Sequence, residues 1–373
     1  MRRFSHYALL SLCLGLLSAC DPAPQHNASM GELMGRADSN FAKVVANQPL
    51  QFPQDHLAHP KFRQEWWYLT ANLTTEDGEP LGLQWTQFRI ALSSQAPAND
   101  SPWATNQLWM THAALTFQNS HQTAERWNRN INAANAPAGV SGMPLAVWNE
   151  NWRWQARGQN DSNAPNNGLL PATLNVSDDS LSYQLNLTSQ APLVLQGDNG
   201  FSIKSADGKV ASYYYSQPFI EVSGQVKRQN KWLKVSGKAW LDREWSSEFL
   251  TRQQQGWDWF AIRLDDGSAL MLFQLRGSDD AAPFFSGKRI WADGRQRVIP
   301  TSEINMQPLA WQQIEAKRYP VSWQIALPSE ALTLTVEALN PQARMPLSVS
   351  YWEGPIKVSG SQTGSGYLEL TGY

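Results

Sequence analysis

Two carboxylates stand two residues apart in the aromatic segment 240–247, at Asp242 and Glu244. Alternate side chains of an extended strand share one face, so both would point away from Arg243 and Trp245. Two carboxylates on one face repel each other unless a cation or a shared proton offsets the repulsion. The spacing predicts either an acid/base pair in a cleft, with Arg243 orienting a substrate or stabilising charge, or a structural ion-pair network of these carboxylates that involves Arg243 or Arg252.

Another carboxylate lies in the run Glu65-Trp66-Trp67-Tyr68. On a strand, Glu65 and Trp67 would face one way, and Trp66 and Tyr68 the other. Burial between bulky rings is costly for an unpaired carboxylate and would raise the pKa of its carboxyl group. The run is therefore a candidate ligand-binding surface that includes one ionisable group.

The C-terminal part of the chain repeats this combination at Trp352 and Glu353. Three distant segments that are each aromatic and acidic are most simply explained by convergence on one site or seam. We therefore expect the tryptophans in and near these segments to be mainly buried around that seam. These tryptophans are Trp66, Trp67, Trp245, Trp257, Trp259 and Trp352.

The sequence gives little support for a metal site, a serine-hydrolase site or a phosphate-binding loop. His56 and His59 could bind a metal, but no cysteine or HExxH helix accompanies them, so we expect loop histidines and no metal site. The sequence has no GxSxG nucleophile elbow. The glycines that follow Gly354 recur in strand-turn settings, as in hairpins, and do not form a phosphate loop. No cofactor is predicted.

The first residues have the pattern of a secretory signal. Arg2 and Arg3 precede an apolar run too short to span a bilayer, and the run ends in Leu-Ser-Ala before Cys20. The pattern resembles a bacterial lipobox, in which residues 1–19 are removed and Cys20 is acylated; Asp21 resembles a mark for inner-membrane retention. The sequence thus predicts a protein anchored in membrane lipid on the periplasmic face of the inner membrane.

The composition narrows the possible partners. The two cysteines are Cys13, inside the signal, and Cys20, so no disulfide is expected. The formal net charge is -2 and no basic stripe is present, so nucleic acid is not expected as a partner. The 18 Trp all lie from Trp66 onward. Such a load can fill large β cores, line a cavity for an apolar molecule, or form platforms for sugar rings.

Period-two patterns dominate beyond residue 60: apolar and polar residues alternate at 181–187 and 332–338 and predict half-buried strands. In the strand expected at 257–264, Trp257, Trp259 and Ala261 share one face, and Phe260, Ile262 and Leu264 share the other. Long loops are expected at 128–144 and 158–171. The absence of long amphipathic patterns after residue 50 predicts an all-β fold. Four Asp-Gly pairs predict tight hairpins with positive φ at both central residues. They are Asp77-Gly78, Asp207-Gly208, Asp266-Gly267 and Asp293-Gly294.

The segments 65–68, 240–247 and 351–373 together resemble the family of AttH-type proteins and the carotenoid hydratase, hydroxyneurosporene synthase. The resemblance implies two consecutive lipocalin-like antiparallel β-barrel or sandwich domains. It further implies hydratase or cyclase activity on isoprenoids in some members. For the secreted or lipid-anchored AttH-type members, it implies association with an ABC-type permease.

The expected organisation follows from combining the signal with this resemblance. The signal peptide spans 1–19 and a lipidated tether spans 20–50. The N-terminal lipocalin-like domain is expected at 51–238 and the C-terminal one at 239–373, where a new series of tryptophan-rich hairpins begins.

The sequence departs from the hydratase pattern at two places. Arg243 stands where the hydratase has a histidine, and the segment 269–273, which corresponds to the strand with its other acidic residue, has no carboxylate. Protonating an alkene requires a positioned acid, and this donor is not in view. The leading hypothesis is therefore a membrane-anchored module that binds an apolar molecule, a lipid or isoprenoid, and works with a permease.

Two alternatives remain open. The first is an isoprenoid-acting hydratase-like or cyclase-like enzyme, with Asp242, Glu244 and Arg243 as catalytic candidates. The second is a cell-envelope glycan-binding module, which would expose several tryptophans on one surface. In both apolar-ligand hypotheses, the expected ligand-binding residues are Glu65, Trp66, Trp67, Tyr68, Trp245, Trp257, Trp352 and Glu353.

Overall fold

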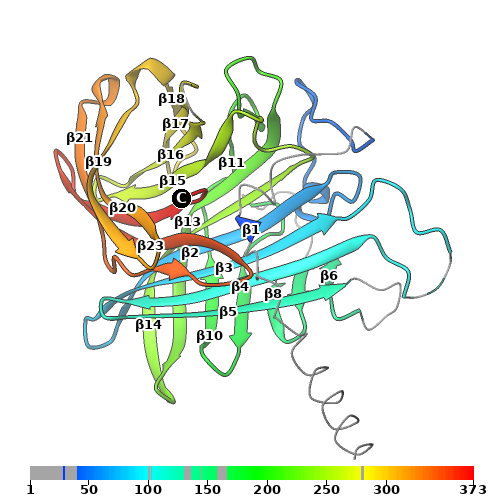
Figure 1. Cartoon of the computed structure of the whole chain (residues 1–373). Helices are drawn as coiled ribbons and strands as arrows, with labels where there is room; N and C mark the ends of the chain where they lie inside the picture. Colours follow the sequence, from blue (N-terminus) through cyan, green and yellow to red (C-terminus); the bar gives the residue numbers. More distant parts are fainter. Residues whose placement is uncertain are drawn as a thin grey trace, which may run out of the picture.

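The computed structural model describes residues 28–29, 40–99, 101, 103–129, 136–142, 144–157, 166–278 and 281–373. Within these ranges, two large antiparallel sheets hold nearly all of the regular structure (Figure 1). The helices described there are three 3-10 turns, η1 (Gln54–His56), η2 (Thr301–Glu303) and η3 (Pro328–Glu330). No described helix is long and apolar enough to cross a membrane. The predicted all-β class is confirmed, while Cys20 and Asp21 lie outside the described residues.

The first sheet has the strand order β5-β4-β3-β2-β14-β13-β10-β9-β8-β7-β6, and β11 and β12 also pair with β13. Its described strands are β2 (Gln64–Thr75), β3 (Pro80–Ala91), β4 (Gln107–Phe117), β5 (Ser120–Arg129), β6 (Ala138–Ser141), β7 (Ala146–Asn149), β8 (Trp152–Ala156), β9 (Ala172–Ser177), β10 (Ser182–Thr188), β11 (Val194–Leu195), β12 (Phe201–Ile203), β13 (Ala211–Arg228) and β14 (Lys231–Ser246).

The first sheet curls almost into a barrel, because side chains join its two ends. Asn128 of β5 donates a hydrogen bond to Asn149 of β7 at 2.7 Å. Arg126 of β5 donates to the carbonyl oxygen of Ser177 in β9 at 3.0 Å. A tryptophan-rich apolar core fills the interior of this lipocalin-like barrel, so its inside is packed protein.

The second sheet has the order β18-β17-β16-β15-β24-β23-β21-β20-β19 and curls into a half-barrel around its own core, with β1 and β22 also paired to β23 (Figure 1). Its described strands are β1 (Ala28–Ser29), β15 (Gln254–Leu264), β16 (Ser268–Gly277), β17 (Phe284–Trp291), β18 (Gln296–Ile299), β19 (Asn305–Ile314), β20 (Lys317–Leu327), β21 (Leu332–Ala338), β22 (Arg344–Met345), β23 (Val349–Gly360) and β24 (Gly364–Leu370).

The change from one sheet to the other follows β14, between Ser246 and Gln254. The expected domain boundary at 238/239 falls inside β14, which pairs with β2 over its whole second half. A strand of 16 residues thus crosses the position at which the tryptophan-rich series begins. Segment 240–247 therefore belongs with the first sheet.

The four Asp-Gly pairs do lie in hairpins, but the expected turn type is wrong. Only the glycines have positive φ, at 84° for Gly78, 69° for Gly208, 84° for Gly267 and 91° for Gly294. In each turn the glycine N–H donates to the carbonyl three residues earlier. This arrangement is a type I turn followed by a left-handed glycine, which needs positive φ at one position only.

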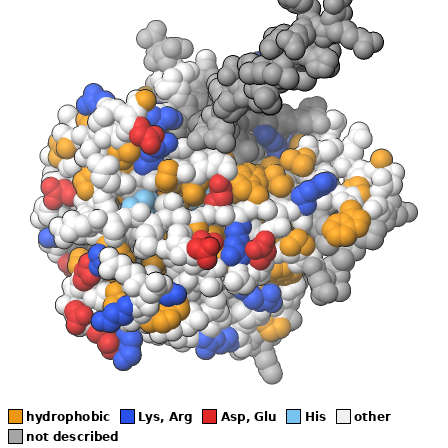
Figure 2. Space-filling model, turned by 60° about the horizontal axis from the view of Figure 1, so that its bottom comes forward, with side chains coloured by type: hydrophobic (Ala, Val, Ile, Leu, Met, Phe, Trp, Pro, Cys, Tyr) orange, Lys and Arg blue, Asp and Glu red, His pale blue; other side chains and the backbone are white. Residues whose placement is uncertain are grey.

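The two sheets pack against each other through the outer face of β2, β3 and β14. The closest approach is at Gly82 of β3, where an added Cβ would lie 2.5 Å from Pro355 Cγ and 2.6 Å from the hydroxyl oxygen of Tyr367. Glycine is required there because the second sheet occupies the space of a side chain. On the face seen in Figure 2, lysines and arginines are interspersed with acidic residues, so this face has no continuous basic surface.

Candidate functional site

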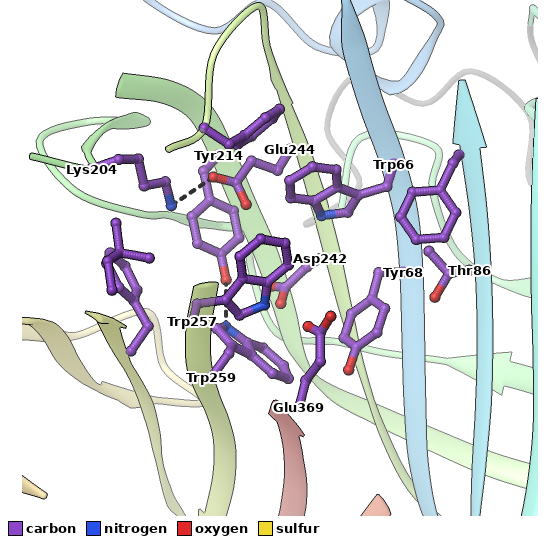
Figure 3. A pocket seen from close by; sticks show the side chains of 14 residues that line it. Trp66, Tyr68, Thr86, Lys204, Tyr214, Asp242, Glu244, Trp257, Trp259 and Glu369 are labelled. Atoms are coloured by element: carbon purple, nitrogen blue, oxygen red, sulfur yellow. Dashed lines mark hydrogen bonds and ion pairs between the residues drawn. The ribbon is translucent and has the colours of Figure 1, made fainter. Parts of the chain in front are cut away.

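The candidate site is a pocket in the seam between the two sheets, seen from close by in Figure 3. It holds about 650 Å³ of atom-free space, its open mouth included, and rings that enter from both sheets leave narrow gaps. Its apolar walls are aromatic apart from one leucine: Trp66, Phe88, Phe249, Trp257, Trp259, Phe273 and Leu275. Its polar side chains are Tyr68, Thr86, Lys204, Tyr214, Asp242, Glu244 and Glu369.

Strand pairing explains why two of the sequence motifs meet here. In the register of β2 and β14, Asp242 lies opposite Tyr68 and Glu244 lies opposite Trp66. Paired residues of adjacent strands share a face, so these four side chains enter the pocket from one wall. The third motif contributes from the other sheet, through Glu369 of β24. The predicted convergence of three distant segments on one seam is borne out.

Asp242 is a buried carboxylate at the centre of this wall, with 2% of its surface exposed. Its Oδ1 accepts a hydrogen bond from Trp240 Nε1 at 2.8 Å and another from the hydroxyl of Ser216. Burial raises the pKa of Asp242 to about 7, against these donors, and the nearby charge of Glu244 acts in the same direction as burial. Asp242 is thus a carboxyl group that can hold its proton near neutral pH.

Glu244 has a cation beside it, which the sequence left unidentified. Lys204 Nζ lies 2.7 Å from its Oε1, and Ser212 donates a hydrogen bond to the same oxygen (Figure 3). The Lys204 ammonium also lies over two rings, 5.0 Å from the centroid of Tyr214 and 4.5 Å from that of Phe273. The repulsion between the two carboxylates of β14 is therefore relieved by the Lys204 ammonium and by the proton that Asp242 retains. Arg243 takes no part in it.

Glu369 enters the pocket from the opposite sheet and is half-buried. Burial raises its pKa to about 8; contact with Trp257 works against this, and the charges of Asp242 and Glu244 work with it. In Figure 3 Glu369 and Asp242 lie around the same space, beside the rings of Trp257 and Trp259. The pocket therefore contains two carboxyl groups whose pKa values are raised to the neutral range.

Sequence reasoning missed Glu369, Lys204 and Tyr214 as site residues. The signal for Glu369 was present, because Tyr367 and Glu369 alternate in the third motif, but only Glu353 of that motif was taken as a candidate. Lys204 precedes the turn between β12 and β13 and carries no motif of its own. Only the folding of this turn against β14 places its ammonium beside Glu244.

Arg243 and Glu65, both expected in the site, lie on the far side of the sheet from the pocket. Glu65 is fully buried and forms ion pairs with Arg243 and Arg89. Burial works to raise the pKa of Glu65, but the two arginines overcome it and hold the pKa well below its usual range. Arg243 also lies 3.9 Å over the Trp67 ring. This ion-pair network joins Arg243 and Arg89 to Glu65, so it differs from the predicted alternative, in which an arginine would pair with Asp242 and Glu244.

His56 and His59 lie at the end of the first barrel at which Glu65 and Arg243 form their ion pair. His59 stacks on Trp245, with 4.0 Å between ring centroids, and its Nδ1 lies 3.2 Å from Glu65. His56 Nδ1 lies 2.6 Å from the hydroxyl oxygen of Tyr215. Their nitrogens have separate partners and do not converge on a common point. Among the residues with a described structure, no cluster of three or more metal-ligating side chains was found.

The tryptophans divide between the cores and the pocket. Trp67, Trp245, Trp259 and Trp352 are buried, and Trp66 and Trp257 are half-buried, so the six are mainly buried as expected. Only Trp66, Trp257 and Trp259 line the pocket. The other three, which were expected to bind ligand, pack elsewhere because each occupies the opposite face of its strand from the pocket.

Glu353 lies beside the pocket and does not line it. Tyr68, which does line the pocket, donates a hydrogen bond from its hydroxyl to Glu353 Oε1. Burial raises the pKa of Glu353 well above its usual range, and the charge of Glu369 adds to the effect. Tyr68 and Glu353 thus form a layer of polar contacts directly behind the pocket wall.

Comparison with known proteins identifies the family. Residues 43–373 match the AttH-like family model. The fold is similar to that of an AttH protein from Nitrosomonas europaea, with 33% identity, a TM-score of 0.76, and coverage of 89% of this chain and 99% of that one. It is also similar to kievitone hydratase from Nectria haematococca, with 12% identity, a TM-score of 0.63, and coverage of 91% and 98%.

A further similar structure is that of CghA with Sch210972, with 10% identity, a TM-score of 0.50, and coverage of 91% and 98%. At such low identities the last two likenesses concern the fold alone. A comparison with curated proteins gave no match. The family match over most of the chain, together with the AttH structure, confirms the resemblance predicted from the motifs: the chain belongs to the AttH-like family.

Proposed function

We propose that this protein is an enzyme that binds a small, largely apolar, unsaturated molecule in the seam pocket and protonates it. One observation carries the proposal: Asp242 and Glu369, with pKa values raised to about 7 and about 8, face a pocket walled by aromatic rings. A general acid works best when its pKa lies near the operating pH. A pocket that only held an apolar molecule would gain nothing from buried carboxyl groups, because their burial is costly.

The chemistry that suits this arrangement is addition to a carbon–carbon double bond. One carboxyl group gives its proton to a carbon of the double bond, and a carbocation develops at the neighbouring carbon. The faces of Trp66, Trp257 and Trp259 can stabilise that charge by about 0.5–2 kcal/mol each. A water molecule then attacks the cation, and the second carboxyl group, as carboxylate, accepts the proton that the water releases. The kievitone hydratase likeness is consistent with this class of reaction.

The proton donor that the sequence lacked is supplied from another strand. Segment 269–273 contributes Phe273 to the pocket but no carboxylate, as the sequence indicated. Glu369 of β24 reaches the pocket instead, because β24 is paired with β15. The missing acid on the expected strand is therefore no argument against acid catalysis in this chain.

The proposal is tested by incubating the purified protein with acyclic isoprenoids and prenylated phenols in ¹⁸O-labelled water, followed by mass spectrometry. We expect a product that has gained one labelled water, and loss of this product in Asp242→Asn and Glu369→Gln. The matched control is Glu337→Gln, which removes an exposed carboxylate on β21, outside the pocket. Equal turnover in both pocket variants and the control would remove these carboxyl groups from the mechanism.

The second candidate function is binding without turnover, as a lipid-anchored protein that serves an ABC-type permease. The aromatic walls of the pocket support it, because they suit an isoprenoid or lipid chain. Organic extraction of the protein purified from its own host, with mass spectrometry, tests this function. Recovery of an unmodified apolar molecule, together with a permease captured by cross-linking, would favour it; neither result is expected for a free enzyme.

The glycan-binding alternative is not carried forward. It needs several tryptophans exposed on one surface, so that sugar rings can stack on them. Four of the six motif tryptophans are buried, and the two half-buried ones, Trp66 and Trp257, line the seam pocket.

A further inference from the structure

A file of polar side chains leads from the pocket to the surface through the seam. It begins at Glu369, passes Glu353 and Tyr351 of β23 and His112 of β4, and ends at Glu125 of β5. Tyr351, Glu353 and His112 are 2%, 1% and 0% exposed. The Glu125 side chain is 19% exposed and therefore reaches solvent. The file thus connects Glu369 in the pocket with solvent at Glu125.

The first link joins two carboxyl groups. Glu353 and Glu369 lie directly opposite each other in the register of β23 and β24. The backbone N–H of Glu353 donates to Ala343 at 3.0 Å, on the other side of the strand. The two glutamates are therefore a non-hydrogen-bonded pair, the closer kind, with Cα atoms about 4.5 Å apart. Carboxylates so placed do not both ionise, so at least one of the pair keeps its proton.

The second part of the file joins this pair to the surface. The Tyr351 hydroxyl lies against the Glu353 carboxyl and is 2.9 Å from His112 Nδ1. His112 Nε2 lies 3.5 Å from Glu125 Oε2. Glu125 is held in place by Ser348, whose backbone N–H donates to it at 3.0 Å, and by Trp127, whose Nε1 donates at 2.9 Å. Every step therefore joins two groups that can carry a proton.

We propose that Glu125, His112, Tyr351 and Glu353 form a proton relay that resupplies Glu369 from solvent. The relay rests on the proposed function, in which Glu369 gives its proton to the bound molecule. It is needed when an apolar ligand fills the pocket mouth, because bulk water then cannot reach Glu369 from that side.

The proton moves inward as a series of transfers between neighbouring heteroatoms. Ionised Glu369 takes a proton from Glu353, which takes one from the Tyr351 hydroxyl. The tyrosine oxygen is reprotonated from His112 Nδ1, while His112 Nε2 takes a proton from water beside Glu125. Glu125 itself is ionised, because burial works to raise its pKa but its contacts with His112 and Ser348 outweigh burial and lower the pKa to about 2. In sum, one proton passes from solvent to Glu369, and no group is oxidised or reduced. Rotation of the hydroxyl and exchange of the histidine tautomer reset the file.

Two buried atoms favour transfer over a purely structural role. Glu353 Oε2 is buried and has no hydrogen-bond partner, and buried His112 Nε2 has only the 3.5 Å approach of Glu125. A structural network is expected to satisfy all of its buried polar atoms, because each unsatisfied one is costly. In this file, the open positions lie at the two ends of the buried part, where protons would leave and enter.

The titratable groups that face the file come from several strands. Tyr68 of β2 lines the pocket and donates to Glu353, so it joins Glu353 to the pocket side and not to the surface end at Glu125. Burial raises the pKa of Tyr367 of β24, and the charge of Glu353 adds to the effect. Asp242 and Glu244 of β14 face Glu369 across the pocket. Burial lowers the pKa of His112, against its contact with Glu125, so this histidine is neutral at pH 7 and can carry a proton on either nitrogen.

Hydrogen–deuterium exchange of the Glu353 carboxyl, followed by infrared spectroscopy after transfer into D₂O, tests the relay without any substrate. The background variant is Glu369→Gln/Tyr68→Phe, which removes both side chains that join Glu353 to the pocket. The carboxylic C=O band of Glu353 is identified as the band that disappears when Glu353→Gln is added to this background. In this background the relay is the remaining path between Glu353 and solvent.

We expect Tyr351→Phe in this background to slow the exchange by roughly tenfold or more, because exchange must then wait for local opening of the seam. Tyr183→Phe is the matched control, since it removes the hydroxyl of another buried tyrosine, which donates to the carbonyl oxygen of Gln84 and lies outside the relay, and it should leave the rate unchanged. Equal rates in the two variants would overturn the relay.

A variant at the surface end covers the case in which Tyr351→Phe does not fold. Glu125→Gln changes a partly exposed side chain and removes the entry carboxylate, so exchange should again be slower than in the background. An unchanged rate would overturn the relay. These measurements need no substrate, so they test the relay separately from the proposed function. Normal turnover, together with an exchange rate that does not change in the relay variants, would contradict the relay alone. Absent turnover with relay-dependent exchange would contradict only the enzymatic function.

Discussion

Asp242 and Arg243 are neighbours in the sequence, yet their side chains lie on opposite faces of β14 and belong to different networks. The Asp242 carboxyl faces the seam pocket and accepts hydrogen bonds from Trp240 and Ser216. The Arg243 guanidinium points into the end of the first barrel and pairs with Glu65. A single motif therefore supplies both a candidate acid and a structural ion pair.

Arg243→Met should destabilise the protein without acting on the chemistry. Removal of one partner from a buried ion pair typically costs about 3–5 kcal/mol, because Glu65 would be left buried with less compensation. Chemical denaturation of Arg243→Met, Glu65→Gln and the double variant should show strong coupling between the two positions. If Arg243 were catalytic, the folded variant would lose turnover with little loss of stability.

Asp242→Asn should make the protein less sensitive to pH. The pKa of Asp242 is about 7 in the folded state and about 3.9 in an unfolded chain, so between these values the folded state holds a proton that the unfolded chain releases. Stability therefore falls as the pH rises through this window. At pH 8 the variant should be more stable than the wild type by as much as about 4 kcal/mol.

The measurement for this variant is urea denaturation at pH 5 and pH 8. The variant keeps the Glu369 carboxyl group, whose pKa is about 8. The free energy of unfolding of the variant should therefore still decline between pH 5 and pH 8, but less than that of the wild type. A decline in Asp242→Asn as steep as that of the wild type would show that Asp242 is ionised in the folded protein at pH 5.

Trp257→Ala and Trp352→Ala should have contrasting effects. Trp352 is fully buried in the core of the second sheet, so its truncation should cost about 3–5 kcal/mol of stability. Trp257 is half-buried at the pocket, so its truncation should cost less and should weaken retention of an apolar fluorescent probe. Thermal denaturation and probe titration of both variants check this, and an equal loss of probe binding in the two would contradict it.

Gly82→Ala should loosen the seam. The new methyl group would lie 2.5 Å from the rigid ring of Pro355, so the sheets must separate locally, at a cost of about 1–3 kcal/mol. Gly142→Ala is the control, because an added Cβ there meets nothing within 4 Å. Acrylamide should quench tryptophan fluorescence more readily in Gly82→Ala than in the control, and equal quenching would mean that the seam tolerates the methyl group.

Lipidation remains a prediction from the sequence, because Cys20 lies outside the described residues. Cells grown with an alkyne fatty acid should label the wild-type protein and leave Cys20→Ser unlabelled. Fractionation of the same cells tests the inner-membrane placement suggested by Asp21. Equal labelling of the two proteins would end the lipoprotein hypothesis.

The sequence by itself determined the strands and their faces. The alternation at 181–187 and 332–338 reappears in β10 and β21, because a strand with one buried face requires a period of two. In β15, which has apolar residues on both faces, both faces are buried over 258–262. The same period of two predicted that Asp242 and Glu244 lie on the opposite strand face from Arg243. The all-β class and the family could therefore be predicted from local patterns and motif order.

Only the tertiary structure decided which faces meet. Alternation assigns Glu65 and Arg243 to a face opposite the pocket, but it cannot say that the pocket lies outside the first barrel, between the sheets. It also gives no sign that Lys204 comes to lie beside Glu244, or that Glu369 faces Asp242. Lys204 and Glu244 are 40 positions apart, and Asp242 and Glu369 lie on separate sheets, so no local spacing encodes these relationships. They arise when the outer face of one sheet buries its aromatic side chains against the other.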